Sequence, residues 1–176
     1  DTEAFLAGEM MGGAAQGYRN AIGITLGTGL GSARSNHGIT EDVNLGSSPF
    51  KDGIAEDYLS TRWFVKKYRE YSGITVAGVK ELLEMHKKGN RCTPHILEEF
   101  CSNLTLFLQS FIAAEKPDVV VIGGNIAQAY DLFYPSMVKT QNTYTDKVIF
   151  KKAKLAEAAA LIGAVSNWMD PITICR

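Results

Sequence analysis

Cysteine is scarce in this chain of 176 residues, and the three that occur are scattered: Cys92, Cys101 and Cys175. An odd number of widely spaced cysteines does not make a disulfide framework, so it favours a reducing compartment and predicts a cytoplasmic protein. None of the three histidines has the spacing of a metal ligand; they are His37, His86 and His95. We therefore expect no metal site built from this chain's own side chains.

Strong net charge and long apolar runs are also missing. The formal net charge is −1, and the few paired lysines do not predict a nucleic-acid surface. No apolar stretch approaches the roughly 18–20 residues that span a bilayer, and the acidic start does not resemble a secretory signal. A hydrophobic fraction of 45% with 21% charged residues is ordinary for a soluble globular domain. We expect one domain over residues 1–176, with neither membrane nor nucleic acid as a partner.

A glycine-rich turn, Gly27-Thr28-Gly29-Leu30-Gly31, closes an apolar run over 21–26. Alternate glycines leave backbone N–H groups bare and allow a phosphate to approach closely. Residues 32–38 lack the 3.6-residue apolar period, so they predict a returning strand and a hairpin over 19–38. A dinucleotide fingerprint needs a helix there, and no GxxxxGK[ST] occurs, which excludes a P-loop. A tight hairpin without a ligand is the alternative interpretation.

Apolar periodicity predicts a mixed α/β protein. We expect helices over 1–16, 54–70, 75–89, from 93 through about 111, from the turn at 123–125 to about 137, and over 153–168. Beyond the hairpin, strands are expected at 119–122 and 148–150, and a loop with a short strand at 38–53. The strand at 119–122 is apolar on both faces, as in a central strand covered by helices.

Four motifs, in this order and spacing, resemble the ROK family (repressor, open reading frame, kinase), whose enzymes are bacterial sugar kinases of the hexokinase and actin-like ATPase superfamily. They are Asp1 with Glu9, the hairpin glycines, Glu56-Asp57-Tyr58-Leu59-Ser60 and Gly123-Gly124-Asn125. The resemblance spans nearly the whole chain but only the larger, C-terminal lobe of such a kinase. It implies an α/β fold, an actin-like ATPase (ribonuclease-H-like) lobe with a mixed β-sheet flanked by helices. The N-terminal lobe, with its Asp-x-Gly-x-Thr phosphate hairpin, is expected to be absent from this chain.

The resemblance implies roles for three side chains on the sugar side. Asp1 stands where the family has the catalytic base, and Glu56 where a glutamate contacts the sugar. Asn44-Leu45-Gly46-Ser47 takes the place of a Glu-x-Gly-His stretch, so Asn44 is the third candidate, with an amide where a carboxylate is usual. Taken without the family, Asp1 and Glu56 are also ordinary acidic residues at helix starts.

On the nucleotide side, the resemblance makes Gly27, Thr28, Gly29 and Gly31 the second phosphate-binding hairpin. Gly123, Gly124 and Asn125 correspond to the adenosine-binding turn, and ligands bind at such strand ends. ATP and Mg²⁺ are therefore the cofactors expected of the complete protein. Many members carry a CxCGxxGC zinc site after the hairpin, but no cysteine precedes Cys92, so we predict no structural zinc.

These implications lead to a working hypothesis: the complete protein phosphorylates a glucose-like hexose with ATP, as a homodimer. The isolated chain is expected to be inactive, because ATP would sit between two lobes. A non-catalytic sugar-sensing module, like the family's repressors, is the main alternative, and a structural remnant that only dimerises is a third. The sequence preceding Asp1 would discriminate between a kinase and a repressor.

Overall fold

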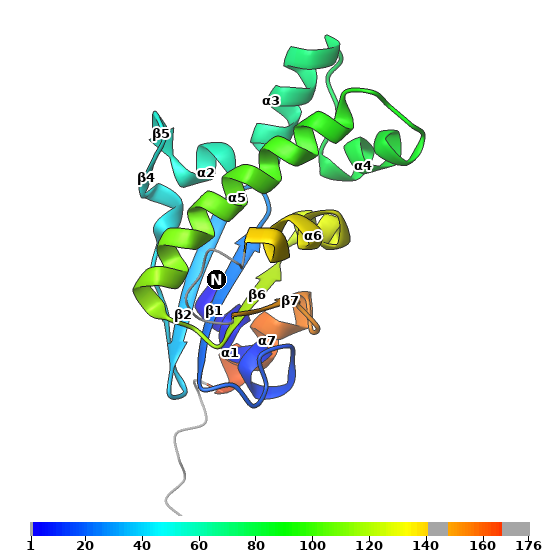
Figure 1. Ribbon diagram of the computed structural model, residues 1–176. Coiled ribbons are helices and arrows are strands. Elements are labelled where there is room, and N and C mark those ends of the chain that lie inside the picture. Colours follow the sequence, from blue (N-terminus) through cyan, green and yellow to red (C-terminus); the bar gives the residue numbers. More distant parts are fainter. Residues whose placement is uncertain (1, 141–147, 167–176) are drawn as a thin grey trace, which may run out of the picture.

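One five-stranded mixed sheet organises the chain, as seen in a computed structural model that describes residues 2–140 and 148–166 (Figure 1). Its strands are β1 (Asn20–Leu26), β2 (Leu30–Asn36), β3 (Ile39–Asp42), β6 (Val119–Gly123) and β7 (Ile149–Lys152). They lie in the order β3-β2-β1-β6-β7, with the first three antiparallel and both β6 and β7 parallel to β1. The expected mixed α/β class is thus confirmed.

Helices cover both faces of the sheet (Figure 1). On one face, α1 (Thr2–Gly12) packs closely against α7 (Glu157–Ser166). The other face carries α5 (Thr93–Glu115) and α6 (Tyr130–Thr140). Successive strand residues point to opposite faces, and β1 therefore serves two cores. Its isoleucines join the larger core under α5, while Ala21 joins the smaller one under α1.

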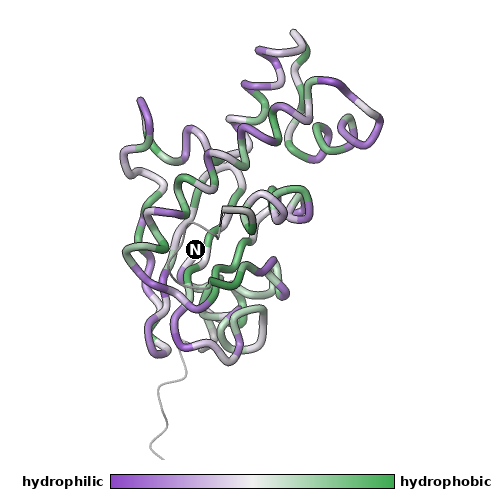
Figure 2. The backbone as a smooth tube through the Cα atoms, in the orientation of Figure 1, coloured by the Kyte–Doolittle hydropathy of each residue, from purple (hydrophilic) through white to green (hydrophobic). Residues whose placement is uncertain are grey.

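A helical extension projects beyond the strand ends. It consists of α2 (Ala55–Tyr58), α3 (Thr61–Ser72) and α4 (Val79–Lys87), gathered around the first half of α5 (Figure 1). Hydrophobic residues follow β1 and β6, whereas hydrophilic residues gather on the outer turns of α3 and α4 (Figure 2). The extension shares one hydrophobic core with the sheet, because the side chains of Trp63, Phe64 and Tyr68 pack in the same cluster as those of β1 and β6.

The buried Phe100 joins the extension to the rest of the molecule. Its ring centroid lies 4.4 Å from that of Phe64 on α3 and 5.1 Å from that of Phe133 on α6. All three side chains are fully buried in the larger core. Burial of such rings is the largest favourable contribution that single side chains make to a core, so α3 is held firmly at the edge of the sheet.

The segment expected as one helix over 54–70 is two helices, α2 and α3, separated by Leu59 and Ser60 in extended or irregular conformations. The N–H of Thr61 donates to the carbonyl of Gly27 at 2.7 Å. This tertiary hydrogen bond takes a donor that a continuous helix would have bonded within itself. The break therefore anchors the start of α3 on the β1–β2 turn.

Other boundaries differ in smaller ways. Thr75 does not begin a helix: α4 starts at Val79, and Glu81 reaches back to accept the N–H of Ala77 at 2.7 Å. Residues 38–53 hold β3, a short 3₁₀ turn (Leu45–Ser47) and β4 (Pro49–Phe50), which pairs with β5 (Gly53–Ile54). After β6, a 3₁₀ segment (Asn125–Ala129) precedes α6. No helix in the described ranges is long and apolar enough to cross a membrane.

Candidate functional site

Two glycine turns that are far apart in the sequence meet at one edge of the sheet. Because β1 and β6 run parallel, with Thr25 opposite Gly123, the turns that follow them emerge side by side. Gly124 has φ +87° and packs directly against the carbonyl of Leu26, so a side chain would be strained and crowded there. A Cβ at Gly27 would lie 3.5 Å from Asn125 Oδ1. The two predicted nucleotide motifs are therefore neighbours.

The hairpin turn keeps free backbone donors. Gly27 N–H donates to the carbonyl of Gly29 at 3.0 Å, which closes the turn. In the part of the chain that the structure describes, no protein acceptor takes the N–H of Thr28 or of Gly29. Unpaired amides at a glycine turn are suited to bind an anion. None of the three hairpin glycines has a positive φ, so backbone conformation does not require them; close neighbours crowd Gly29 and Gly31 but not Gly27.

Gly31 is crowded by two threonines. A Cβ there would collide with the hydroxyls of Thr2 and Thr25, whose Oγ1 atoms lie 3.1 Å apart. The start of α1 is thus packed onto the hairpin. Asp1 itself, the predicted base, lies outside the described residues, but its neighbour Thr2 is held at the site.

Glu56 lies against the same turn. Its Oε2 accepts the N–H of Leu30 at 3.1 Å, and its Oε1 lies 2.6 Å from Nη2 of Arg62. A Cβ at Gly29 would be 2.5 Å from Glu56 Oε2. A side chain at Gly29 would therefore push this carboxylate away from the N–H of Leu30, a constraint that sequence reasoning missed.

The turn that begins at Asn44 completes one side of the site. Gly46 packs on the carbonyl of Leu30, and a Cβ on it would lie 3.6 Å from Glu56 Oε2. Asn44 has φ +51°, a left-handed conformation that asparagine tolerates, and Ser47 Oγ donates to its carbonyl at 3.2 Å. The structure thus brings the 44–47 turn and Glu56 together, while the sugar-binding roles of Asn44 and Glu56 stay predictions.

A groove of about 640 Å³ opens on the other side of the turn, between Thr28 and α3. Three cationic side chains of α3 line it: Arg62, Lys66 and Arg69. Their spacing places them on one helix face. Glu70 also lines the groove, so three positive charges face one negative charge among the described lining residues, and the groove attracts anions. In the sequence these residues form only a charged stripe on a helix, which is usually a solvated face, and their proximity to Thr28 becomes visible only in the fold.

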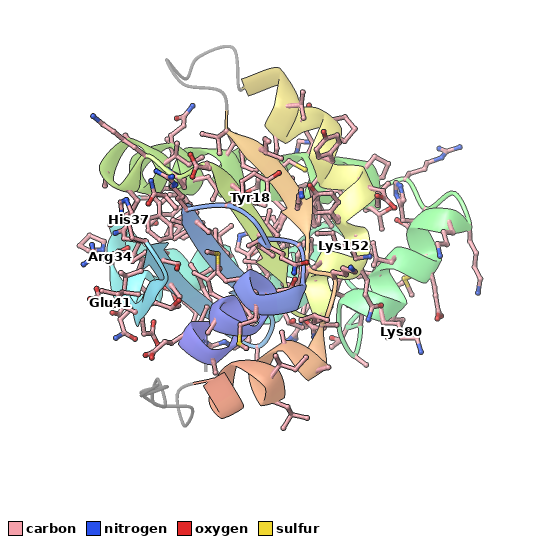
Figure 3. The ribbon with its side chains drawn as sticks, turned by 90° about the horizontal axis from the view of Figure 1, so that it is seen from below. Tyr18, Arg34, His37, Glu41, Lys80 and Lys152 are labelled. Atoms are coloured by element: carbon pink, nitrogen blue, oxygen red, sulfur yellow. The ribbon has the colours of Figure 1, made fainter. Side chains whose placement is uncertain are left out.

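Other charged and polar groups do not belong to this site. Arg34 bonds Glu41 at 2.9 Å and Glu115 at 3.0 Å at the outer edge of the sheet, and Figure 3 shows Arg34 beside Glu41, away from Lys80. Burial raises the pKa of Cys101 to about 11 and that of Tyr130 further above its ordinary value. Both groups stay protonated near neutral pH, so neither is a candidate base. Within residues 2–140 and 148–166, no three His, Cys, Asp or Glu side chains form a group that could hold a metal ion.

Comparison with known sequences gives one family and distant relatives. The model of the ROK family matches residues 37–170. An uncharacterized protein of Clostridium perfringens is 24% identical over 183 residues, which cover 97% of this chain and 62% of the relative. The N-acetyl-D-glucosamine kinase of Haemophilus influenzae is 26% identical over 117 residues, covering 64% of this chain and 38% of that enzyme.

Solved structures share the fold at low identity. A ROK family glucokinase from Streptomyces griseus, in complex with glucose and AMPPNP, superposes with a TM-score of 0.81 at 20% identity, over 94% of this chain and 65% of that chain. A ROK family transcriptional regulator, a homologue of the Escherichia coli MLC protein, superposes with a TM-score of 0.78 at 18% identity. The match covers 93% of this chain and 49% of that chain. The chain therefore spans less than two thirds of the length of these relatives, and the fold is common to kinases and regulators.

Proposed function

Because the chain belongs to the ROK family, we propose that the complete protein transfers a phosphoryl group from ATP to a glucose-like hexose. The observation that carries this proposal is the position of the hairpin turn. Unpaired amides of Thr28 and Gly29 lie on it, and the carboxylate of Glu56 is bonded to its far side through Leu30. An anion site and a hydroxyl-binding carboxylate separated by one turn suit a reaction between a phosphate and a sugar alcohol.

On the sugar side, we assign Glu56 and Asn44 to hydroxyl recognition. A carboxylate accepts charge-assisted hydrogen bonds from hydroxyl groups, while an amide can both donate and accept. The Haemophilus relative is named for N-acetyl-D-glucosamine and the Streptomyces structure contains glucose. Both sugars are therefore reasonable first substrates.

On the nucleotide side, we assign Gly27, Thr28, Gly29 and Gly31 to the phosphates, and Gly123, Gly124 and Asn125 to the adenosine. The hairpin amides would donate to phosphate oxygens, and Arg62, Lys66 and Arg69 supply positive charge along the groove. Mg²⁺ bound with ATP supplies charge neutralisation during transfer. No group of acidic side chains in the described ranges would hold the ion by itself, so we expect it to arrive on the nucleotide.

Asp1 is our candidate base. It precedes Thr2, whose hydroxyl lies 3.1 Å from that of Thr25 at the root of the hairpin. A carboxylate at this position would accept the proton of the sugar hydroxyl as the phosphoryl group transfers. The cytoplasmic location and the homodimer inferred from the sequence stay predictions.

A sugar-sensing regulator without turnover is the second candidate, because a ROK transcriptional regulator shares the fold. A coupled assay of the complete protein with ATP, Mg²⁺ and either glucose or N-acetylglucosamine distinguishes the two. Turnover with either sugar supports the kinase. Sugar binding by calorimetry without turnover would make the protein a sensor, and failure to bind either sugar would refute both assignments.

A further inference from the structure

The carboxylate assigned to the sugar is already occupied by two donors. Glu56 Oε1 lies 2.6 Å from Nη2 of Arg62, and Oε2 accepts the N–H of Leu30 at 3.1 Å. The backbone donor is fixed by the hairpin, but the arginine comes from α3 through a long side chain. A hydroxyl that approaches Glu56 therefore meets an acceptor whose charge is partly neutralised by Arg62.

The ion pair is exposed enough to exchange. The side chain of Arg62 is 70% exposed and that of Glu56 31%. Surface ion pairs of this kind favour the paired geometry by only about two- to fivefold. A competing anion of higher charge can therefore displace Glu56 from the guanidinium at little cost.

Arg62 also lines the groove that runs from Thr28 along α3. A phosphate group in this groove offers the guanidinium more negative charge than a carboxylate does, and a geometry that allows two parallel hydrogen bonds. Arg62 can thus bind either of two anionic groups: the carboxylate of Glu56 on the sugar side, or a phosphate on the nucleotide side.

We propose that Arg62 is a latch between the two substrate sites. It covers Glu56 in the absence of nucleotide and turns to the phosphates when nucleotide binds, which frees Oε1 for a sugar hydroxyl. This inference rests on the proposed function, and Arg62 is a positioning residue because it acts on the sugar through Glu56. The expected consequence is that nucleotide strengthens sugar binding by about two- to fivefold, the strength of one exposed ion pair, and that sugar strengthens nucleotide binding by the same factor.

Lys66 provides a matched control. It lines the same groove one helical turn beyond Arg62 and is exposed. Among the described residues it forms no ion pair, whereas Arg62 contacts Glu56. Both side chains add a positive charge to the groove, but only Arg62 joins the groove to the carboxylate. Removal of Lys66 should therefore weaken nucleotide binding without altering how nucleotide and sugar affect each other.

The experiment measures glucose and N-acetylglucosamine binding to the complete protein by calorimetry, with and without AMPPNP and Mg²⁺. In the unmodified protein, AMPPNP should lower the sugar dissociation constant about two- to fivefold. Arg62→Met should lower the sugar dissociation constant by the same factor in the absence of nucleotide. In this variant AMPPNP should have no further effect on sugar binding. Lys66→Met should raise the AMPPNP dissociation constant and keep the effect. Circular dichroism verifies folding, and Arg62→Gln is a second variant if the methionine perturbs α3.

The other possible outcomes contradict either the latch or the proposed function. Coupling that survives in Arg62→Met, or sugar binding that weakens in that variant, overturns the latch while leaving the proposed function intact. Independent binding of sugar and nucleotide in the unmodified protein would also overturn the latch and leave the proposed function intact. Absence of binding by both sugars refutes the proposed function, and the latch with it.

Discussion

Glu9 on α1 and Leu155, which precedes α7, are joined by a hydrogen bond of 2.8 Å from the N–H of Leu155 to Glu9 Oε1. The other oxygen of the carboxylate, Oε2, accepts the N–H groups of Ala14 at 2.6 Å and Lys154 at 3.1 Å. Glu9 is fully buried. A buried carboxylate without hydrogen bonds would be very costly, so these three backbone donors explain why it is tolerated. Two of them, Lys154 and Leu155, tie α1 to the segment that leads into α7.

The first prediction concerns this carboxylate. Glu9→Gln leaves one acceptor oxygen and turns an NH₂ group toward backbone donors, so at least one buried N–H loses its partner. We expect the free energy of unfolding to fall by about 2–4 kcal/mol. Denaturant unfolding of the complete protein measures it, with the exposed Glu84→Gln as the control. Equal stability of the two variants would mean that the hydrogen bonds of Glu9 to Lys154 and Leu155 do not stabilise the fold.

The second prediction concerns the base. If Asp1 accepts the proton of the sugar hydroxyl, Asp1→Asn keeps the size and removes the basicity. In the complete protein, kcat should fall by about 10²–10⁴-fold, with sugar affinity altered only a few-fold. Steady-state kinetics and calorimetry measure the two quantities. A kcat within about threefold of the original would exclude Asp1 as the base.

The third prediction concerns the phosphate hairpin, for which Gly27 is a better test position than Gly29. A side chain at Gly29 would displace Glu56, so a loss of ligand affinity in such a variant would not distinguish the phosphate site from the sugar site. A Cβ at Gly27 meets only Asn125 Oδ1, at 3.5 Å, and the fold should accept Gly27→Ala. We expect AMPPNP affinity to fall at least several-fold while sugar affinity without nucleotide is unchanged. Unaltered AMPPNP affinity would show that no phosphate approaches this glycine.

The fourth prediction concerns alkaline pH. Burial raises the pKa of the Cys101 thiol from 9.0 to about 11. Between these values the folded protein keeps a proton that the unfolded chain has lost, so stability falls as pH rises through this window. The slope contributed by Cys101 is at most about 1.4 kcal/mol per pH unit.

Cys101→Ala tests this by denaturant unfolding between pH 8 and 11. The decline should be shallower than in the unmodified protein, although the buried Tyr130 still contributes because its pKa is also raised by burial. Cys92→Ala, at a half-buried position, serves as the control. Identical slopes for all three proteins would contradict a protonated Cys101.

Sequence reasoning predicted the parts of this protein that depend on local pattern. The hairpin, the buried strand β6 and the amphipathic α5 have periodicities that no tertiary contact alters. The family resemblance assigned both the 44–47 turn and Glu56 to the sugar, and the structure places the two side by side. The prediction of one continuous helix was wrong at Leu59 and Ser60. The hydrogen bond from Thr61 to Gly27, which separates α2 from α3, joins segments that are distant in the sequence, so no local pattern indicates it.

The same limit applies to the candidate site. Glycine spacing indicated a phosphate turn, but it could not show that Glu56 lies beside Gly29 or that two threonine hydroxyls lie beside Gly31. Neither contact produces a recognisable pattern in the sequence, because Glu56 and Thr2 are far from these glycines along the chain. The ion pair of Arg62 with Glu56, six residues apart across a helix break, could not be inferred either, because a continuous helix would have placed these residues on different faces.

The parallel pairing of β1 with β6 also constrains how the protein folds. The central strand of the sheet receives this partner only after the whole of α2 to α5 has been made. Until then β1 has one strand neighbour and an unpaired edge. Non-local strand pairing closes a long loop and slows folding. The nascent hairpin is therefore exposed to intermolecular strand addition during synthesis, and the docking of β6 closes the open edge of β1.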